Sequence, residues 1–500
     1  MKYIIFNPDY CLKPDKSKTL LLYRYQGRNT VNGVDDSKTC IIHPIHAMII
    51  SFMNGKEYKV CVNAAAKFLN ISIELIENFI NTLLDNPNQV LIKTGEREGS
   101  IFLPKTIISL DEEDIQERYD PSIFEYDDIK LQIERHLTPT KVTLMFNNIC
   151  YTDCIYCYED KTIKVNCGIP LQRILELIRE ARKLNVVTFD VVGGEFFLYN
   201  KWREVLSELR KNDYDPYLSS KMPLNEDDVK LLSDLKVRDI QVSLDSAIEE
   251  HLLASIKAKR GYVDEMKKFL FLLSKYNIPV MLHTVLTKHN DSIEDMESIY
   301  NILKQCSNIY VWHIVKGEST LYPRTDYKNI EISNDALSDI ANYLKKISGQ
   351  ASFPIIYPEP EISREVNEEL LTLTDKKLEK LAFDDFFSRA ACSGLLSSLY
   401  ILPTGKVTIC EQLYWNHPRF YVGDVLCNSL EEIWNSKESL GLFYLKPEDI
   451  PSDSLCHTCK SFYKCRNIKQ VCYREIIKKY GKDKWYYPDV NCPYVKINTI

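Results

Sequence analysis

The sequence has no apolar run long enough to cross a membrane and no excess of positive charge. At its start, MKYIIFNPDYCLKPDK contains only four consecutive apolar residues, too few for the core of a signal peptide. The net charge of −7 argues against a protein whose main partner is the phosphate backbone of a nucleic acid. We therefore expect a cytoplasmic protein that has neither a membrane nor a nucleic acid as its partner.

The rest of the composition is that of an ordinary globular protein. Hydrophobic residues make up 45% and charged residues 27% of the 500 residues, enough for a substantial core. A chain of this length is expected to form roughly three domains. Low-complexity segments are absent, and the only repeated feature is an alternation of strands and helices in the middle of the chain.

Sixteen cysteines are many for a cytoplasmic protein. A disulfide framework is not expected there, because the thiol pool keeps such bonds reduced. The cysteines of residues 150–157 and 392–492 form two groups of chemical interest. The remaining five are isolated, and we interpret them as small buried hydrophobic residues: Cys11, Cys40, Cys61, Cys167 and Cys306.

Short apolar strands alternate with amphipathic helices from residue 141 to residue 350. We expect strands in KVTLMF, VVTFDVV, YLSS, DIQVSLD, PVMLHTVL and NIYVWHIV. In the first helix, apolar residues recur at three- and four-residue spacing at Leu171, Ile174, Leu175, Ile178 and Ala181. This pattern predicts an α/β fold, a partial (β/α)6 TIM-like barrel of parallel strands, in which the loops after the strands carry the chemistry.

The N-terminal part shows the element order of a small winged helix. Two strand-like segments precede three helices and a closing strand. The expected recognition segment, NISIELIENFINTLL, has no Arg or Lys and so lacks the side chains that contact DNA phosphates. His43 and His46 are spaced as a metal pair on a helix would be, but we interpret them as residues that open a helix.

Composition divides the chain into five expected parts. Residues 1–110 form the winged helix, residues 111–140 an acidic linker, and residues 141–350 the barrel. Residues 351–391 form a bridging segment, and residues 392–500 a cysteine-rich domain.

Three cysteines follow the first expected barrel strand directly, in CYTDCIYCYED. The spacing of Cys150, Cys154 and Cys157 lets one tight loop turn three thiolates toward one centre, which suits a four-iron cluster with one open iron. A zinc site with a distant fourth ligand is the alternative interpretation.

With Tyr156 before its last cysteine, this loop resembles the signature of the radical S-adenosylmethionine (SAM) superfamily, C-x3-C-aromatic-C. The resemblance implies that the open iron binds the amino and carboxylate groups of SAM. It also implies that the reduced cluster cleaves SAM to a 5′-deoxyadenosyl radical, which abstracts hydrogen from the substrate. An electron donor such as flavodoxin or ferredoxin would be a partner.

Two further segments match this superfamily in chain order and imply SAM-binding residues. Gly193, Gly194 and Glu195 in VVGGEFF match the GGE motif, in which the glycines let the methionine part of SAM approach and the carboxylate faces its ammonium group. Ser243 and Asp245 in VSLDS match the S-L-D element near SAM.

Two positions depart from the superfamily pattern. Ser219 and Lys221 in YLSSKMP occupy the place where many members have Thr-Asn-Gly, and we expect both to contact the cofactor. The arginine that many relatives carry a dozen residues after the serine is also missing, since Ser255 stands there. Lys257 or Arg260 would have to replace it as the partner of the SAM carboxylate.

The second group of cysteines resembles the SPASM extension of radical SAM maturases. Cys392, Gly405 and Cys410 fit its first block, and CHTCKSFYKC fits its second, but six residues instead of three separate Cys465 from Cys472, which indicates an inserted loop. A zinc ribbon is the alternative. The resemblance implies two auxiliary four-iron clusters, three clusters in all: one held by Cys392, Cys410 and Cys472 with Cys427 as a candidate fourth ligand, the other by Cys456, Cys459, Cys465 and Cys492.

The N-terminal domain then resembles the winged helices that bind the leader of a precursor peptide as an added strand. The combination implies a radical SAM maturase that modifies a ribosomally synthesised precursor peptide by hydrogen abstraction and oxidative cross-linking, through a thioether or a carbon–carbon bond. Alternatives are a sulfatase-type maturase of a folded protein, a peptide epimerase and, in a different class, a zinc-containing winged-helix DNA-binding regulator.

Overall fold

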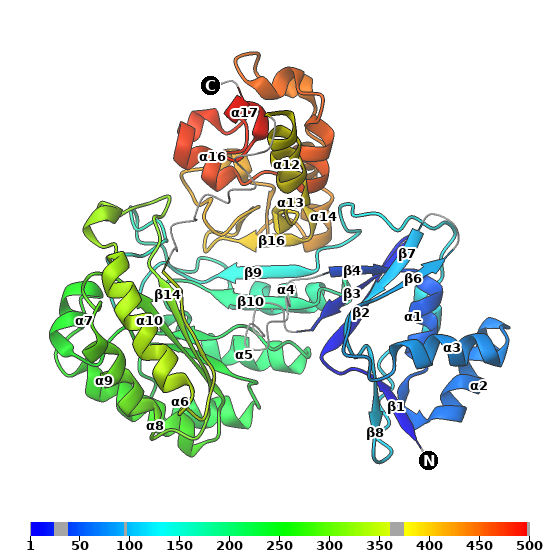
Figure 1. Ribbon diagram of the computed structural model, residues 1–500, viewed down its shortest axis with the longest axis horizontal. Helices are drawn as coiled ribbons and strands as arrows, with labels where there is room; N and C mark the ends of the chain where they lie inside the picture. The colour runs from blue at the N-terminus through cyan, green and yellow to red at the C-terminus, as the bar shows by residue number, and fades with distance from the viewer. Residues whose placement is uncertain (1, 25–38, 95–97, 361–374, 498–500) are drawn as a thin grey trace. The chain divides into compact units, whose positions relative to one another are not determined.

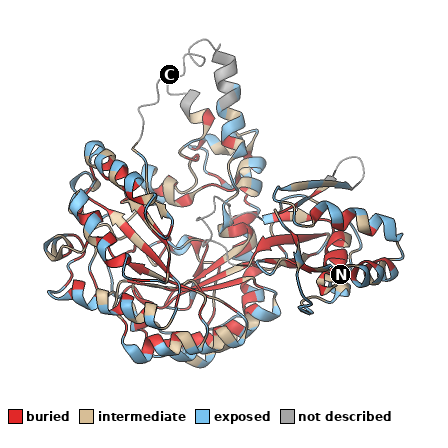
Figure 2. Ribbon diagram, turned by 60° about the horizontal axis from the view of Figure 1, so that its bottom comes forward, coloured by how far each residue is buried: buried red, intermediate tan, exposed pale blue. Residues whose placement is uncertain are grey.

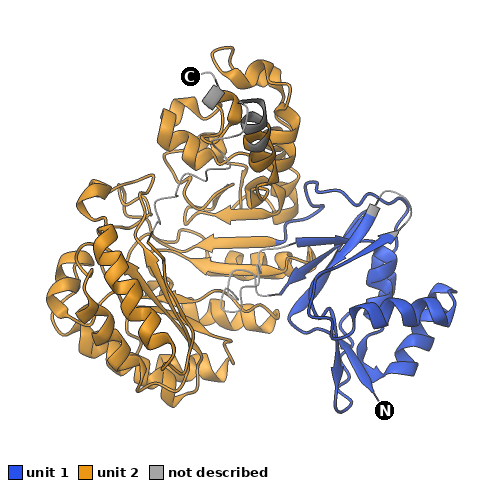
Figure 3. Ribbon diagram, viewed as in Figure 1, with its two compact units in different colours: residues 1–140 blue, residues 141–500 orange. Residues whose placement is uncertain are grey.

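The computed structural model describes residues 2–24, 39–94, 98–360 and 375–497. The chain divides after Thr140 into two compact units (Figure 3). No helix within these described ranges is both long enough and apolar enough to cross a membrane.

The described residues of the first unit form antiparallel sheets, a hairpin and the helices α1 to α3 (Figure 1). One sheet has the order β2-β3-β4, the second has the order β5-β1-β8, and β6 pairs with β7. The helix, strand, helix, helix and hairpin that follow β4 have the order of a winged helix. The elements are β1 (Tyr3–Phe6), β2 (Tyr10–Asp15), β3 (Lys18–Tyr23), β4 (Thr39–Ile42), α1 (Pro44–Ser51), β5 (Asn54–Glu57), α2 (Tyr58–Leu69), α3 (Ile73–Leu83), β6 (Val90–Thr94), β7 (Glu98–Phe102) and β8 (Ile107–Leu110).

The first strand-like segment of this unit forms two strands, β1 and β2. They belong to different sheets. Between β1 and β2, the side-chain oxygen of Asn7 accepts the N–H of Asp9 at 3.0 Å, and its main-chain carbonyl accepts the N–H of Tyr10 at 3.0 Å. Pro8 between them fixes its own φ, which favours a turn at this point. The Asn-Pro-Asp sequence therefore ends β1 and redirects the chain.

Residues 111–140, expected to be a linker, pack on the first unit. The hydroxyl of Tyr119 accepts the N–H of Leu12 at 2.9 Å, along the edge of β2 that β3 leaves open. The guanidinium of Arg118 donates to three main-chain carbonyls of the first ten residues, and Phe124 is buried in the core of the unit. A few aromatic and basic side chains thus attach residues 111–140 to the rest of the first unit, although the composition of this segment is acidic.

His43 and His46 open α1, as expected. Nδ1 of His43 accepts the N–H of Ile45 at 3.1 Å and so caps the helix. Nδ1 of His46 lies 2.7 Å from the hydroxyl of Ser100, and its ring stacks on Phe79. Burial lowers the pKa of His46 to about 3, so this imidazole is neutral.

The isolated cysteines differ in burial. Cys40, Cys61 and Cys306 are buried, as expected, whereas Cys11 and Cys167 are only partly buried.

The second unit contains the predicted barrel strands. Each of the six overlaps a predicted segment, and adjacent barrel strands pair in parallel. They divide between two sheets, β10-β9-β16-β17-β18 and β11-β12-β13-β14-β15, which is the arrangement of a partial barrel. The strands are β9 (Lys141–Met145), β10 (Thr188–Val192), β11 (Ser219–Ser220), β12 (Ile240–Ser243), β13 (Val280–Leu286), β14 (Ile309–Lys316), β15 (Ile355–Ile356), β16 (Ser398–Ile401), β17 (Lys406–Thr408) and β18 (Gly423–Asp424).

Helices cover the outer face of the barrel strands, which form the buried centre in Figure 2. The first of them buries Leu177, not the expected Leu175, beside Ile174, Ile178 and Ala181. The barrel helices are α4 (Leu171–Lys183), α5 (Trp202–Lys211), α6 (Glu226–Asp234), α7 (Glu249–Ser255), α8 (Tyr262–Lys275), α9 (Ile293–Leu303) and α10 (Asn334–Ser348).

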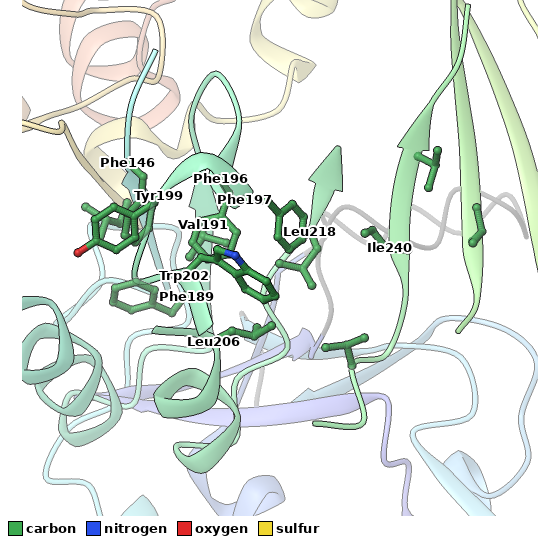
Figure 4. Packing of buried hydrophobic residues seen from close by; sticks show 14 of the residues in the cluster. Phe146, Phe189, Val191, Phe196, Phe197, Tyr199, Trp202, Leu206, Leu218 and Ile240 are labelled. Carbon is green, nitrogen blue, oxygen red and sulfur yellow. The ribbon is translucent and has the colours of Figure 1, made fainter. Parts of the chain in front are cut away.

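Aromatic rings pack around the end of β10 (Figure 4). The ring centroids of Phe146 and Phe196 are 5.0 Å apart, and those of Phe197 and Trp202 are also 5.0 Å apart. Truncating one such buried ring to alanine typically costs about 3–5 kcal/mol. This packing fixes the place where the GGE motif leaves the sheet.

The cysteine-rich part shares a sheet with the barrel. β16 pairs in parallel with β9, from Ser398 opposite Lys141 to Ile401 opposite Leu144. Residues 141–500 consequently form one compact unit. The remaining helices are α12 (Asp375–Ser388), α13 (Ser393–Leu396), α14 (Leu430–Trp434), α15 (Lys437–Phe443), the π-helix η8 (Lys464–Lys469), α16 (Tyr473–Tyr480) and α17 (Pro493–Ile497).

Candidate functional site

A cavity of about 190 Å³ lies at the carboxyl ends of the first barrel strands. Four segments that are far apart in the sequence meet in its wall: the cysteine loop, the GGE motif, the end of β11 and the end of β12. The predicted site residues that line it are Cys150, Cys154, Cys157, Gly193, Gly194, Glu195, Ser219, Lys221 and Ser243.

The cysteine loop is held by the main chain at the end of α7. The N–H of Asp153 donates to the carbonyl of Ile256 at 2.8 Å, and the N–H of Ile155 donates to that of Ser255 at 2.9 Å. Ser255 stands where relatives carry arginine, so in this chain that position supports the loop through its main chain.

Gly193 and Gly194 are required by a close approach of two main-chain segments. A Cβ on Gly194 would lie 2.4 Å from the carbonyl oxygen of Ile149, and one on Gly193 would lie 2.7 Å from that of Asn147. The N–H of Gly194 also donates to Asn147 at 2.7 Å. The glycines thus let the end of β10 lie against the chain that leads into Cys150, a role that the sequence did not indicate.

Glu195 is 3% exposed, and its carboxyl group accepts several hydrogen bonds. Ser220 donates its hydroxyl at 2.9 Å, and the N–H groups of Phe197 and Lys221 both donate at 3.3 Å. Burial raises the pKa of Glu195 to about 7, although the hydrogen bonds act in the opposite direction. Such a carboxyl group binds a nearby cation favourably, because the cation supplies the missing counter-charge.

Lys221, Asp245 and Tyr156 form a hydrogen-bonded group beside the cavity. Nζ of Lys221 lies 2.8 Å from the carboxylate of Asp245 and 2.8 Å from the hydroxyl of Tyr156, which also donates to Asp245. Asp245 is fully buried and holds the other two side chains, whereas Lys221 lines the cavity itself.

The cavity contains neither of the cations considered for the missing arginine, but it contains Lys221. Arg260 has a side chain that is 74% exposed and pairs with Glu249 and Glu250. The residues that line the cavity include Lys221 but neither Lys257 nor Arg260. The neighbouring Asp245 raises the pKa of Lys221 against the opposing effect of burial, so this side chain remains a cation.

Lys161 contacts the cysteine loop and was missed in the sequence. Its Nζ donates to the sulfur of Cys150 at 3.2 Å and to the carboxylate of Glu159 at 2.6 Å. Glu159 is itself buried. A lysine four residues after Cys157 is visible in the sequence, but the turn that directs it back to the cysteines is not.

The sequence also gave no signal for a pair of histidines on neighbouring strands. His283 and His313 are directly opposite each other in the pairing of β13 with β14, with ring centroids 5.6 Å apart. Burial, and to a smaller extent the charge of Lys221, lowers the pKa of His283 to about 4. This imidazole is therefore neutral at physiological pH and able both to donate and to accept a hydrogen bond.

The seven cysteines proposed for the auxiliary clusters form two sets. Cys410 lies close enough to Cys392 and Cys472 for their charges, with that of Glu411, to add to the rise in its pKa to about 12 that burial causes. Cys427 is exposed in the turn after β18, where its N–H donates to Asp424 at 3.1 Å. The other set lines one small hollow: Cys456, Cys459, Cys465 and Cys492.

Cationic side chains lie beside these thiols and suit an anionic group held by them. In the described parts of the chain, no three His, Cys, Asp or Glu side chains are arranged to hold one metal ion. Cationic side chains contact a sulfur in each of two sets: Lys161 contacts Cys150, and Arg466 lies 3.5 Å from Cys456. Thiolates bound to iron carry the negative charge that these cations complement.

Two family models match the chain. Residues 144–303 match the radical SAM superfamily, and residues 392–460 match SPASM, an iron-sulfur cluster-binding domain. The chain therefore contains a radical SAM domain, and a SPASM domain follows the barrel. The second match favours iron over the zinc ribbon, and the first makes the protein an enzyme instead of a DNA-binding regulator.

The fold is similar to that of Streptococcus suis SuiB. The crystal structure of SuiB bound to S-adenosylmethionine aligns over 98% of this chain and 99% of SuiB, with a TM-score of 0.60 and 13% identity. The structure of SuiB bound to its precursor peptide SuiA aligns over 98% and 100%, with the same TM-score and identity. No curated protein matches the sequence.

Proposed function

We propose that the protein is a radical SAM maturase that abstracts hydrogen from a ribosomally synthesised precursor peptide and closes an oxidative cross-link in it. The observation that carries this proposal is the cavity in which three cysteines face Glu195 and Lys221. SuiB, which has a similar fold over its whole length, has been crystallised with its precursor peptide, and this supports a peptide substrate.

The cavity residues have distinct roles in binding SAM. Cys150, Cys154 and Cys157 would hold the cluster, Glu195 the ammonium group, and Lys221 the carboxylate of SAM. When bound, the reduced cluster supplies the electron that cleaves SAM to a 5′-deoxyadenosyl radical. Ser219 and Ser243 line the same wall and offer hydroxyl groups to the nucleoside part.

Cross-linking removes two hydrogens from the peptide. The first leaves as an atom, transferred to the deoxyadenosyl group. The second leaves as a proton and an electron, and the auxiliary clusters supply an acceptor for that electron. We assign one of these clusters to Cys392, Cys410 and Cys472, and the other to Cys456, Cys459, Cys465 and Cys492.

The first unit would bind the leader of the precursor as an added strand. In the sheet of described strands β2-β3-β4, Tyr119 occupies the outer edge of β2, and β4 is the other outer strand and lies beside β7. The helix α3 (Ile73–Leu83) contains acidic residues and no Lys or Arg. A peptide strand is therefore a better partner for this unit than DNA.

Mass spectrometry of the precursor after co-expression tests the proposal. Short open reading frames next to the gene for this chain would be searched for the precursor. Loss of two hydrogens per linkage, absent with a Cys150→Ala, Cys154→Ala, Cys157→Ala variant, is the expected result. An inverted residue at unchanged mass would identify an epimerase and reject cross-linking.

A further inference from the structure

Arg466 is a buried arginine with hydrogen-bond donors that the protein leaves unused. The residue is 2% exposed. Its Nη2 donates to the carbonyls of Tyr486 at 3.0 Å and Tyr487 at 2.6 Å, and lies 3.5 Å from the sulfur of Cys456. Nε and Nη1 are buried and have no hydrogen-bond partner among the described residues. A buried cation with unmade hydrogen bonds is costly, so an acceptor is expected beside it.

The hollow beside Arg466 is where that acceptor would lie. Arg466 lines it together with the four cysteines of the second set and Asp489. The carboxylate of Asp489 already accepts the N–H of Asn491 at 3.0 Å and that of Cys472 at 3.5 Å. Nε and Nη1 of Arg466 make no hydrogen bond to this carboxylate, so they are left for another acceptor in the hollow.

A second arginine contacts this set of cysteines. Nη2 of Arg389 lies 3.6 Å from the sulfur of Cys465 and donates to the carbonyl of Gln470 at 2.9 Å. Its guanidinium packs over the ring of Phe386, 3.9 Å from the centroid. Two cations thus reach two different sulfurs of one four-cysteine set.

The inserted loop of the sequence explains how Arg466 reaches the hollow. The six residues between Cys465 and Cys472 include most of the π-helix Lys464–Lys469, and Gln470 follows with a φ of 60°. A π-helix is wider than an α-helix and is often found at functional sites. The extra residues thus form a wide turn that buries Arg466.

We propose that Arg466, assisted by Arg389, is a positioning residue for the auxiliary four-iron cluster of this hollow, and that it makes this cluster easier to reduce than the SAM-binding cluster. Its free N–H groups would hydrogen-bond to a cluster held by these cysteines. Reduction adds one negative charge, so these bonds and the positive charge stabilise the reduced state and raise the potential. The inference rests on the proposed function, because it requires an iron-sulfur cluster at this site.

The charges beside the two clusters differ. Lys161, next to Cys150, is paired with the buried carboxylate of Glu159, so its charge is largely cancelled. Arg466 and Arg389 form no ion pair with a described residue, and the nearby Asp489 is a single acid against two cations. The electrostatic environment therefore favours an extra electron more at the auxiliary site than at the SAM site.

A redox titration tests this inference. In a background lacking Cys150, Cys154 and Cys157, electron paramagnetic resonance reports only the auxiliary clusters of the iron-loaded full-length protein. In Arg466→Gln, we expect the ratio of reduced to oxidised cluster at a fixed potential to fall about tenfold for one of the two signals, which is about 59 mV for a one-electron couple. The control Arg419→Gln, an exposed arginine over Trp485 in the same region, leaves both signals unchanged.

The possible results separate this inference from the proposed function. Iron-loaded Arg466→Gln with an unshifted or raised potential overturns the inference and leaves the proposed function standing. Wild-type protein that binds no iron overturns the proposed function itself. If Arg466→Gln does not fold, the same titration of Arg389→Gln decides, because Arg389 is only partly buried and contacts a different sulfur.

Discussion

The carboxyl group of Glu195 links SAM binding to pH. Burial raises the pKa of this group to about 7 in the protein without SAM. If the carboxylate faces the ammonium group of SAM, binding favours the ionised form, so below pH 7 the protein must release a proton before SAM binds well. With a pKa of about 7, the ionised fraction falls about tenfold between pH 8 and pH 6.

We therefore expect the affinity of the iron-loaded, oxidised enzyme for SAM to fall about tenfold from pH 8 to pH 6, or about 1.4 kcal/mol. Isothermal titration calorimetry at pH 6, 7 and 8 measures this change. Because SAM has its own titrating amine, the control is Glu195→Gln, which fills the same space without a titrating group. The variant should bind SAM more weakly at pH 8 and show a smaller loss toward pH 6.

The raised pKa of Glu195 also affects the stability of the SAM-free protein. A higher pH favours SAM binding but lowers this stability. An ordinary glutamate has a pKa of 4.5, so the folded state holds this proton more tightly than the unfolded chain does. The folded state loses stability relative to the unfolded chain as the pH rises from about 4.5 to about 7, by up to about 3 kcal/mol. Glu195→Gln should therefore raise the melting temperature of SAM-free protein at pH 8 but not at pH 4.5. Parallel pH profiles of SAM affinity for wild type and variant would refute this role of Glu195.

Three further predictions concern the cysteine sets and the first unit. Lys161→Met should lower the reduction potential of the SAM-binding cluster by about 59 mV, and Glu159→Gln should raise it by about 59 mV. A redox titration followed by electron paramagnetic resonance measures both shifts, and substitution of the exposed Lys164 by Met is the control without a shift. Cys459→Ala with Cys465→Ala should abolish the cross-linked product while chromatography still detects 5′-deoxyadenosine, and loss of both would contradict the separate role of that set. Removal of residues 1–140 should leave SAM cleavage intact and abolish saturable binding of a fluorescent leader peptide, whereas unchanged leader binding would show that the first unit is not the leader site.

The barrel was predictable because its signals are local. Apart from β11 (Ser219–Ser220), the barrel strands are rich in apolar residues, and the apolar residues of α4 keep helical spacing over about three turns. Each of these elements can therefore be recognised from a few consecutive residues. The pairing of β16 with β9 joins residues more than 250 positions apart, and no local pattern predicts it. For the same reason, the acidic composition of residues 111–140 gave no sign that Tyr119 and Phe124 attach that segment to the first unit.

The candidate site was predictable where a motif fixes the chemistry. Spacing and resemblance led to the cysteine loop, the GGE motif and Lys221, and the structure brings these into one cavity wall. The cations that contact the cysteine sulfurs were not found, because Lys161 and Arg466 lie outside the motifs and their directions depend on the turns between ligands. Asp245 was predicted from its motif to lie near SAM, but its carboxylate does not line the cavity. It binds Lys221 and Tyr156 behind the cavity wall instead.

Transfer of a label from the peptide to the cofactor tests the central claim most directly. The precursor is prepared with deuterium on its carbon-bound hydrogens and incubated anaerobically with the iron-loaded enzyme, SAM and a reductant. Hydrogen abstraction from the peptide predicts deuterium in 5′-deoxyadenosine in step with a product that has lost two hydrogen positions. Unlabelled 5′-deoxyadenosine formed beside an unmodified peptide would contradict the account.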